Sequence, residues 1–429
     1  MSPTTASDTG KGTPAPTGVA PLPLPQSVDE LGIRKSSLED LALKIVYVEG
    51  ELTVKELAAK MRISYKAADE LFQSLRKTQL LEVKGMVAGV HRIVASAEGR
   101  ARASELFTVN QYTGPAPVSF KEYVGRVRAQ SVKNFPVRQE LVEHAFEHLV
   151  LTPQTLRQLG TAVVSGTSIM LYGPTGTGKT SIAESIPRIY HDRVWVPYAV
   201  QVDAHVIMVY DPIIHQSDDK AVTGDYDTRW VPCHRPRVIV GGELTIDMLD
   251  LQFHPVSKFY AAPVQMKANN GALILDDFGR QRITPEELLN RWTVPLDRGM
   301  DFFSLMGGRK LEVPFDLFVV FATNLNPSSL ADEAFLRRIH NKIKIDNIDA
   351  AQFHLVFERV CKRYELKYDR PVVDSLIELL ATEWKQPLRP CYPSDLINQV
   401  LWVSRYEGKP PQINRETLSQ ACHNYFLAP

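Results

Sequence analysis

The spacing of apolar and polar positions predicts helices and a hairpin before residue 100. Apolar residues recur with helical spacing in three stretches: 37–48, 54–61 and 65–80. Ser36 or Ser37 can cap the first of these helices, and Thr53 can cap the second, because a hydroxyl accepts hydrogen bonds from the free amides of a first turn. Residues 81–95 then predict a two-stranded hairpin closed near its glycines.

This order of elements resembles a winged helix, in which the third helix can enter the major groove of DNA. The exposed start of that helix carries Tyr65 and Lys66 but also Asp69 and Glu70, and the region as a whole is only mildly basic. Two roles therefore stay open for residues 33–110: contact with DNA, or docking to a protein.

The pattern changes after about residue 136, where short apolar runs alternate with helix-compatible stretches. Such alternation is typical of a parallel sheet with helices on both faces. Strands are expected within 168–172, 271–277 and 317–323, and 181–186 is compatible with a helix. The sequence thus predicts an α/β fold for this part of the chain.

The segment GPTGTGKT has the form G-x-x-x-x-G-K-[ST] and lies between a predicted strand and a predicted helix. Its glycines let the backbone take conformations closed to residues with a Cβ, so that successive N–H groups turn toward one point. A triphosphate fits that concavity, with Lys179 adding a positive charge and Thr180 a hydroxyl to Mg²⁺. The residues expected to bind the nucleotide are Gly173, Pro174, Thr175, Gly176, Thr177, Gly178, Lys179, Thr180 and Ser181.

Two acids and an amide follow two of the predicted strands. Asp276 and Asp277 end the run 271–277, and Asn324 follows the run 317–323. Buried parallel strands end at the ligand crevice, so both carboxylates are expected to face the phosphates, with Asp276 holding Mg²⁺ and Asp277 acting as the general base on the attacking water. The strand before Asn324 is expected between the other two, where its amide can hydrogen-bond the γ-phosphate and the water.

Arg337 and Arg338 are adjacent, after a predicted helix and before a returning strand. Adjacent arginines are ordinary surface charges in most proteins. Beside a nucleotide site they suggest a finger that reaches the nucleotide of a neighbouring subunit, because a planar guanidinium suits a triphosphate better than an ammonium does.

Composition adds limits on domain number and partners. The chain has 429 residues, enough for two or three domains, and its 49 Lys and Arg balance its 49 Asp and Glu, so net charge does not favour nucleic acid or a membrane as the main partner. No apolar run approaches the ~18 residues of a membrane span, and the four cysteines form no C-x-x-C pair. We expect no membrane contact and a reducing, cytoplasmic location.

Residues 1–32 are rich in Pro, Thr, Ser and Gly, which predicts a disordered tail.

The loop GPTGTGKT, the strand GALILDD, the strand VVFATN and the block ending in LRRI occur in the order seen in AAA+ ATPases. The chain from 136 to 429 resembles that superfamily, and residues 295–324 resemble the β-hairpin insertion of MoxR-like ATPases, magnesium chelatases and enhancer-binding activators. The resemblance implies an α/β nucleotide-binding domain at 136–347 and an α-helical lid at 348–429. It also implies ATP and Mg²⁺ as ligands, ATP hydrolysis, and a homo-oligomeric, hexameric ring.

The resemblance also assigns roles by position. Asn324 is similar to the first sensor, and Arg337 or Arg338 to the arginine finger, with Arg337 preferred because it ends the preceding helix. The superfamily usually has Glu where Asp277 stands, which puts fast hydrolysis in doubt. Ser394 stands where a second sensor arginine is usual, and Arg389 is the substitute that could contact the nucleotide.

With residues 111–135 as a linker, these parts predict an ATP-hydrolysing motor or switch that remodels an unidentified protein client. Two alternatives stay open. One is a DNA-bound regulator in which nucleotide sets the oligomeric state, and the other is a nucleotide-stabilised scaffold that hardly hydrolyses ATP.

Overall fold

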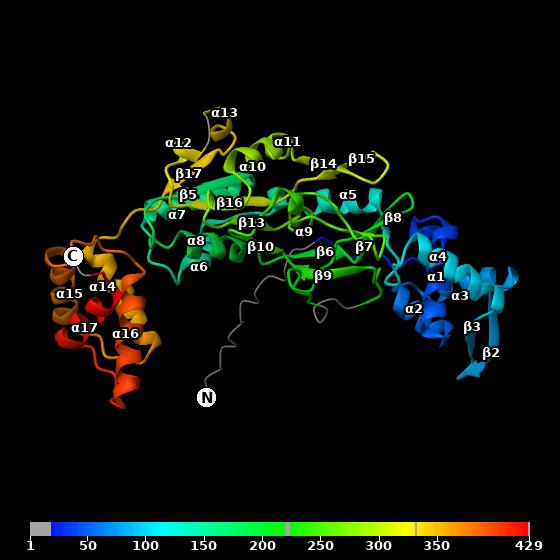
Figure 1. The fold of residues 1–429 in the computed structure, drawn as a ribbon, viewed down its shortest axis with the longest axis horizontal. Helices are drawn as coiled ribbons and strands as arrows, with labels where there is room; N and C mark the ends of the chain where they lie inside the picture. The colour runs from blue at the N-terminus through cyan, green and yellow to red at the C-terminus, as the bar shows by residue number, and fades with distance from the viewer. Residues whose placement is uncertain (1–18, 219–223, 331–332, 428–429) are drawn as a thin grey trace, which may run out of the picture. The chain divides into compact units, whose positions relative to one another are not determined.

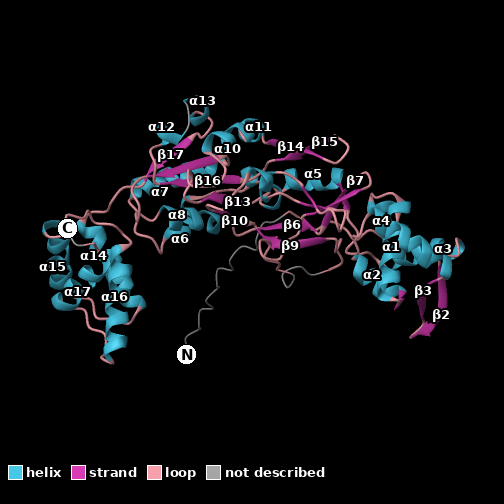
Figure 2. Ribbon diagram, viewed as in Figure 1, coloured by secondary structure: helices cyan, strands magenta, loops and turns pink. Residues whose placement is uncertain are grey.

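The computed structural model describes residues 19–218, 224–330 and 333–427 of the chain (Figures 1 and 2). The contacts between residues divide it into two compact units. Unit 1 is built from the chain up to residue 130, from 190–236 and from 253–262, and unit 2 from 131–189, 237–252 and 263–429. The long segment between the loop motif and the acidic strand therefore contributes to both units.

Unit 2 contains a five-stranded sheet in which every neighbouring pair is parallel. Its strands lie in the order β10 (Arg237–Val240), β13 (Ala272–Leu275), β16 (Phe318–Thr323), β5 (Ser168–Tyr172) and β17 (Asn341–Lys344). All residues of β13 and β16 are buried. Such continuous burial is expected of parallel strands that are covered on both faces.

Helices lie on both sides of this sheet. Among them, α7 and α8 pack against β5. The helices of this part of unit 2 are α6 (Gln139–Phe146), α7 (Pro153–Ser165), α8 (Lys179–Ser185), α9 (Val264–Lys267), α10 (Pro285–Arg291), α11 (Thr293–Arg298), α12 (Pro327–Leu330) and α13 (Glu333–Leu336), with 3-10 turns η2 (Val132–Asn134), η3 (Ile186–Ile189) and η5 (Ile246–Leu249). The strand predictions are confirmed, and the middle position of β16 between β5 and β13 is confirmed as well.

A β-hairpin precedes the central strand of the sheet. It consists of β14 (Met300–Ser304) and β15 (Lys310–Pro314), which pair antiparallel from Met300 with Pro314 to Ser304 with Lys310. The hairpin expected before β16 is therefore present.

Four helices follow the sheet: α14 (Ala350–Arg363), α15 (Arg370–Thr382), α16 (Tyr392–Glu407) and α17 (Arg415–Tyr425). They share an apolar cluster that includes Phe353, Phe357, Leu380, Leu396 and Leu418. Phe353 and Phe357 are four residues apart on α14, which puts them on one helix face. The C-terminal region is thus helical, as expected of the lid.

The first part of unit 1 has the order of elements that the sequence predicts. It consists of α1 (Lys35–Glu49), β1 (Glu51–Thr53), α2 (Val54–Met61), α3 (Tyr65–Lys77), β2 (Leu81–Val87), β3 (Val90–Ala95) and α4 (Ala97–Val109), with an antiparallel sheet in the order β1-β3-β2. Thr53 caps α2 in a capping box with Glu56, as predicted.

Two local predictions in this region are wrong. The first helix begins at Lys35, so Ser36 and Ser37 already lie inside its first turn and neither caps it. The third helix ends at Lys77 rather than at residue 80, because Gln79 has a positive φ of 59°, which takes the backbone out of the helical path.

The rest of unit 1 joins segments that are distant in sequence. A five-stranded sheet has the order β11 (Gln252–Phe253), β12 (Tyr260–Ala261), β8 (His205–Met208), β7 (Ala199–Val202) and β4 (Val118–Ser119), beside a strand pair β6 (Arg193–Pro197) and β9 (Trp230–His234). Ala199 and Val206 belong to the same apolar cluster as residues of α1 to α4. The predicted linker contains α5 (Phe120–Ala129), whose Tyr123 and Val127 are buried.

Part of the predicted tail packs on unit 1. Residues 1–18 lie outside the described residues, whereas Val28 and Leu31 are fully buried, with Leu31 in the short turn η1 (Asp29–Leu31). Arg126 donates a hydrogen bond to the backbone carbonyl of Ala20, and the Trp195 indole donates one to that of Val19. The composition of residues 19–32 predicted disorder wrongly, because a few apolar side chains find partners that are distant in sequence.

None of the helices in the described part of the chain combines the length and apolar character that crossing a bilayer requires.

Candidate nucleotide-binding site

The glycine-rich loop connects the end of β5 to the start of α8. Gly173, Gly176 and Gly178 all have positive φ values, of 140°, 76° and 87°. At Gly173 a Cβ would lie 2.2 Å from the Ile345 carbonyl oxygen, so only glycine lets the loop pass the end of β17. The loop therefore has the local geometry that the motif predicts for an anion cradle.

Lys179 is buried in its own loop. Its Nζ donates to the carbonyl oxygens of Gly173 at 2.9 Å and of Pro174 at 2.6 Å. Burial lowers the pKa of the ammonium, and the charges of Asp277 and Asp276 oppose that shift. The cation is thus held at the centre of the loop, where an incoming phosphate can replace the two carbonyl oxygens as its partner.

Asp276 lies close to the loop motif although it follows a strand two places away in the sheet. Its Oδ1 accepts a hydrogen bond from Thr180 Oγ1 at 3.0 Å. A hydroxyl and a carboxylate are oxygen ligands of the kind Mg²⁺ takes beside a triphosphate. Thr180 and Asp276 therefore fit the two protein ligands that the sequence predicts for the metal.

The strand register explains why the two acids and the Asn324 amide meet. Tyr172 of β5 pairs with Thr323 of β16, and Leu275 of β13 pairs with Phe321. The residues that follow these strands consequently emerge at one edge of the sheet.

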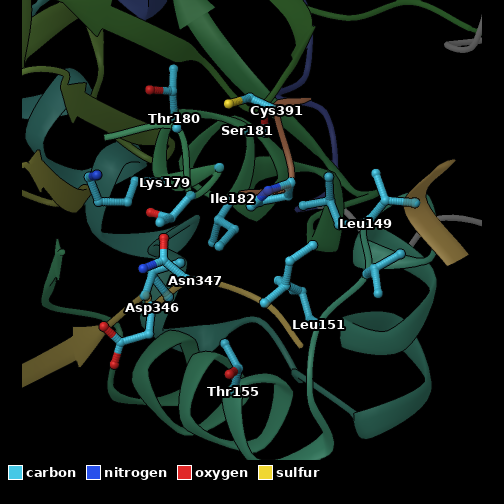
Figure 3. A pocket seen from close by; sticks show the side chains of 18 of the residues that line it. Leu149, Leu151, Thr155, Lys179, Thr180, Ser181, Ile182, Asp346, Asn347 and Cys391 are labelled. Carbon is cyan, nitrogen blue, oxygen red and sulfur yellow. The ribbon is translucent and has the colours of Figure 1, made fainter. Parts of the chain in front are cut away.

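A cavity of about 840 Å³ covers that edge (Figure 3). Its lining contains Thr175 to Ser181 of the loop together with Asp276, Asp277 and Asn324. All these predicted site residues are therefore brought together in one cavity. Gly173 and Pro174 form the base of the loop, where their carbonyls contact Lys179.

The other end of the cavity is more apolar. In Figure 3, Leu149 and Leu151 lie across the pocket from Thr180, and the lining also includes Ile348 and Val356. A flat, weakly polar ring fits such walls while the phosphates remain at the loop. These residues belong to no sequence motif, and they precede or follow helices that pack together only in the fold, so the sequence alone does not identify them.

Arg359 connects the helical region to this apolar end. From α14 it donates to the carbonyl oxygens of Glu147 at 2.8 Å and of Leu149 at 3.2 Å. Arg363, four residues later on the same helix, also lines the cavity. This i, i+4 pair of arginines was the one available sequence signal for the contribution of the helical region.

Arg389 lies beside the loop, outside the cavity lining. Its Cδ would be 3.3 Å from a Cβ on Gly176, its guanidinium stacks on Tyr392 at 5.6 Å, and its Nε is buried without a hydrogen-bond partner. Ser394 lines the cavity itself. The arginine and the serine that the sequence singled out in this region are both near the loop.

Arg337 and Arg338 do not line the cavity. Arg338 Nε contacts Asp297 Oδ2 at 3.0 Å, whereas Arg337 is exposed and has no ion pair among the described residues. Of the two arginines, Arg337 is the one whose guanidinium is open to a second molecule.

Three comparisons with known proteins find only limited similarity between this chain and other proteins. A family model described as "Domain of unknown function (DUF8689)" matches residues 349–424. A search of curated proteins finds no match. Among solved structures, a substituted variant of RuvB from Thermotoga maritima is 15% identical, covers 70% of this chain and 73% of its own, and has a TM-score of 0.37. A second variant is 13% identical, with coverages of 69% and 72% and a TM-score of 0.36. RuvB described as a Holliday junction branch migration motor is 15% identical, with coverages of 70% and 72% and a TM-score of 0.35.

The fold class follows from the order of the strands and helices. The strand that precedes the loop motif lies between β16 and β17, β13 and its two acids lie beyond β16, and a helical region follows the sheet. This chain has an α/β fold with a parallel five-stranded sheet, helices on both faces and a C-terminal helical region, which is the arrangement that the resemblance to AAA+ ATPases predicts.

Proposed function

We propose that this chain binds ATP and hydrolyses it to ADP and phosphate. The observation that supports this most is that the glycine-rich loop, both acids and the sensor amide line one cavity. A turn that served only the fold would not need three glycines at positive φ opposite two carboxylates.

In the proposed reaction the loop amides and Lys179 bind the β- and γ-phosphates. Mg²⁺, held by Thr180 and Asp276, would neutralise phosphate charge. Asp277 accepts a proton from a water molecule while the water oxygen forms a bond to the γ-phosphorus. The bond between the γ-phosphorus and the oxygen that bridges it to the β-phosphate then breaks, which releases ADP. The Asn324 amide orients the γ-phosphate and that water through hydrogen bonds.

The helical region would report the nucleotide state. Arg389 has a buried, unpaired Nε beside Gly176, so a phosphate at the loop would give it the partner it lacks. Arg359 donates hydrogen bonds to two carbonyl oxygens at the apolar end of the cavity. Ligand contacts at both ends would therefore change how this region packs on the sheet, which is the role we propose for it as a lid.

We propose that Arg337 completes the site of a neighbouring subunit in a ring. Its exposure and its lack of an ion pair among the described residues support this choice over Arg338. A finger supplied in trans is worth about 10³ to 10⁵ in rate. Turnover should therefore depend on assembly.

A protein client, rather than DNA, is the partner that unit 1 favours. The turn before α3 is covered: Ile63 and Ser64 are buried, and Thr228 Oγ1 donates to the Arg62 carbonyl. The backbone N–H of Val28 donates to the Glu70 carboxylate at 3.1 Å. The turn before α3 and the Glu70 carboxylate thus contact the protein's own chain, while Tyr65 and Lys66 at the start of the helix are exposed. We infer that the winged-helix-like part acts as a protein-docking module of a remodelling ATPase.

The test of ATP binding compares the wild-type chain with Lys179→Ala in calorimetry with ATP and Mg²⁺. We expect binding to the wild type and its loss in the variant, while Lys362→Ala, which removes an exposed lysine of α14, behaves like the wild type. Absence of binding to the wild type would refute the proposal.

Hydrolysis is tested separately by phosphate release from Asp277→Asn, which should bind ATP but not turn it over. Duplex DNA titrated at low salt should show no saturable binding to the full chain. Saturable, salt-dependent binding would instead support the DNA-bound regulator.

A further inference from the structure

We propose that Gln281 is the positioning residue for Asp277. This inference rests on the proposed function, in which Asp277 is the general base. Gln281 does not line the cavity, and its side chain acts through the turn that carries the acid.

The side chain of Gln281 closes that turn with two hydrogen bonds. Its Nε2 donates to the Asp276 carbonyl oxygen at 2.8 Å, and its Oε1 accepts from the Gly279 N–H at 2.8 Å. One amide thus satisfies an acceptor before Asp277 and a donor after it. A backbone hydrogen bond from the Arg280 N–H to the Asp277 carbonyl, at 3.0 Å, closes the same turn from inside.

The turn needs such closure because Asp277 is in the left-handed region, with φ of 48°. This conformation is uncommon for residues with a Cβ, although aspartate and asparagine tolerate it better than others do. An aspartate therefore suits the position where AAA+ ATPases usually have glutamate. The surrounding contacts must hold a conformation that the residue itself does not prefer.

The opposite side of the turn is held by the sensor strand. The Phe278 N–H donates to the Ala322 carbonyl at 2.7 Å, and Thr323 Oγ1 donates to the Phe278 carbonyl at 2.7 Å. Phe278, directly after Asp277, is thereby fixed to β16, while Gln281 links Asp276 before the acid to Gly279 after it. The carboxylate between these two anchors keeps one direction, toward the cavity that it lines.

The chemistry of the amide predicts which substitutions matter. Gln281→Ala removes both hydrogen bonds, and Gln281→Met removes them while it keeps the length and packing of the side chain. Gln281→Glu keeps the acceptor for Gly279 but places a carboxylate oxygen against the Asp276 carbonyl, where no donor remains. All three should release the turn, and the carboxylate of Asp277 should lose its fixed direction.

The experiment measures kcat and KM for ATP, and ATP affinity by calorimetry, for these variants of the full chain. We expect kcat to fall about 10²-fold, the scale for misplacement of a catalytic group by about 1 Å, with KM and affinity within about twofold of wild type. Glu286→Gln, which alters an exposed residue of α10, is the matched control and should behave like the wild type. Thermal melting of each variant identifies any that does not fold, and Gln281→Met then supplies the comparison.

A double-variant cycle tests whether Gln281 acts through Asp277. In an Asp277→Ala background, measured by single-turnover release of labelled phosphate, Gln281→Met should cause no further loss. Unchanged kcat in Gln281→Met, a parallel loss of affinity, or an equal loss without Asp277 would each overturn the inference. If the wild type does not hydrolyse ATP, or Asp277→Asn retains turnover, the proposed function itself fails. A normal wild type with an inactive Asp277→Asn and a fully active Gln281→Met removes the inference alone.

Discussion

Cys391 of the helical region lies directly over Gly176 of the glycine-rich loop. A Cβ on Gly176 would come within 2.7 Å of Cys391 Sγ. The two residues are distant in sequence, yet the absence of a side chain on one makes room for the thiol of the other. Burial raises the pKa of that thiol to about 11, so it remains protonated and acts as a small packing group at neutral pH.

We expect Gly176→Ala to weaken ATP binding by about tenfold or more, because the new methyl group displaces Cys391 and because φ of 76° disfavours alanine. Gly178→Ala is the matched comparison: its φ of 87° has the same backbone cost, but no atom lies within 4 Å of the added Cβ. Calorimetry of Gly176→Ala with Cys391→Gly should recover the steric part of the loss. Equal affinities for the single and double variants would contradict the packing explanation.

Arg337→Ala should reduce ATP turnover by at least about 10³-fold while ATP still binds, because the finger acts on a neighbouring site. Arg338→Ala should have the smaller effect, since its guanidinium contacts Asp297 within the chain. Mixing Arg337→Ala with Asp277→Asn should restore part of the activity, because mixed assemblies contain sites with an intact acid and an intact finger. Phosphate release from the mixture measures this, and no recovery at any ratio would argue against a finger in trans.

Lys44 should make stability depend on pH. Burial lowers its pKa to about 8, although its Nζ donates to the Asn110 carbonyl and Asp40 lies near. The folded pKa lies below the unfolded one of about 10.5, so the unfolded chain binds more protons between these values and the free energy of unfolding rises with pH across that window.

Urea unfolding at pH 7.5 and 9.5 measures this effect when the wild type is compared with Lys44→Met. The stability of the wild type relative to the variant should increase by about 1 to 2 kcal/mol at the higher pH, since only the wild type loses the cost of a buried charge. A constant difference between the two proteins would show that Lys44 is not the group responsible.

Arg229→Met should destabilise unit 1 by about 3 to 5 kcal/mol, the usual cost of leaving a buried charge without its partner. Arg229 is fully buried, pairs with Asp227 at 2.7 Å and donates to the carbonyls of Leu31 and Pro117. Adding Asp227→Asn to Arg229→Met should recover part of the loss, because the uncompensated carboxylate is then absent. Chemical unfolding curves of the single and double variants provide the measurement, and a mild effect of Arg229→Met would show that solvent reaches this pair.

The sequence alone determined the local parts of the site. The strand, loop and helix around GPTGTGKT follow from a short apolar run, glycines at positive φ and a helix-compatible stretch, all within one segment. The cap of α2 by Thr53 is also local, because a hydroxyl needs only the amides of the next turn. Predictions failed where local propensity competes with distant contacts, as in residues 19–32.

Only the tertiary structure decided which distant segments meet. The strand order brings Asn324 and Asp276 to the loop, and helix packing adds Arg359, Cys391 and the apolar walls near Leu149. The same holds for unit 1, which takes strands from the segment between the two nucleotide motifs. Sequence patterns indicate burial and periodicity within one element. The contacts named here depend instead on pairing and packing between elements that are far apart in the chain. Many different partners would be compatible with the same local pattern, so the pattern does not select one of them.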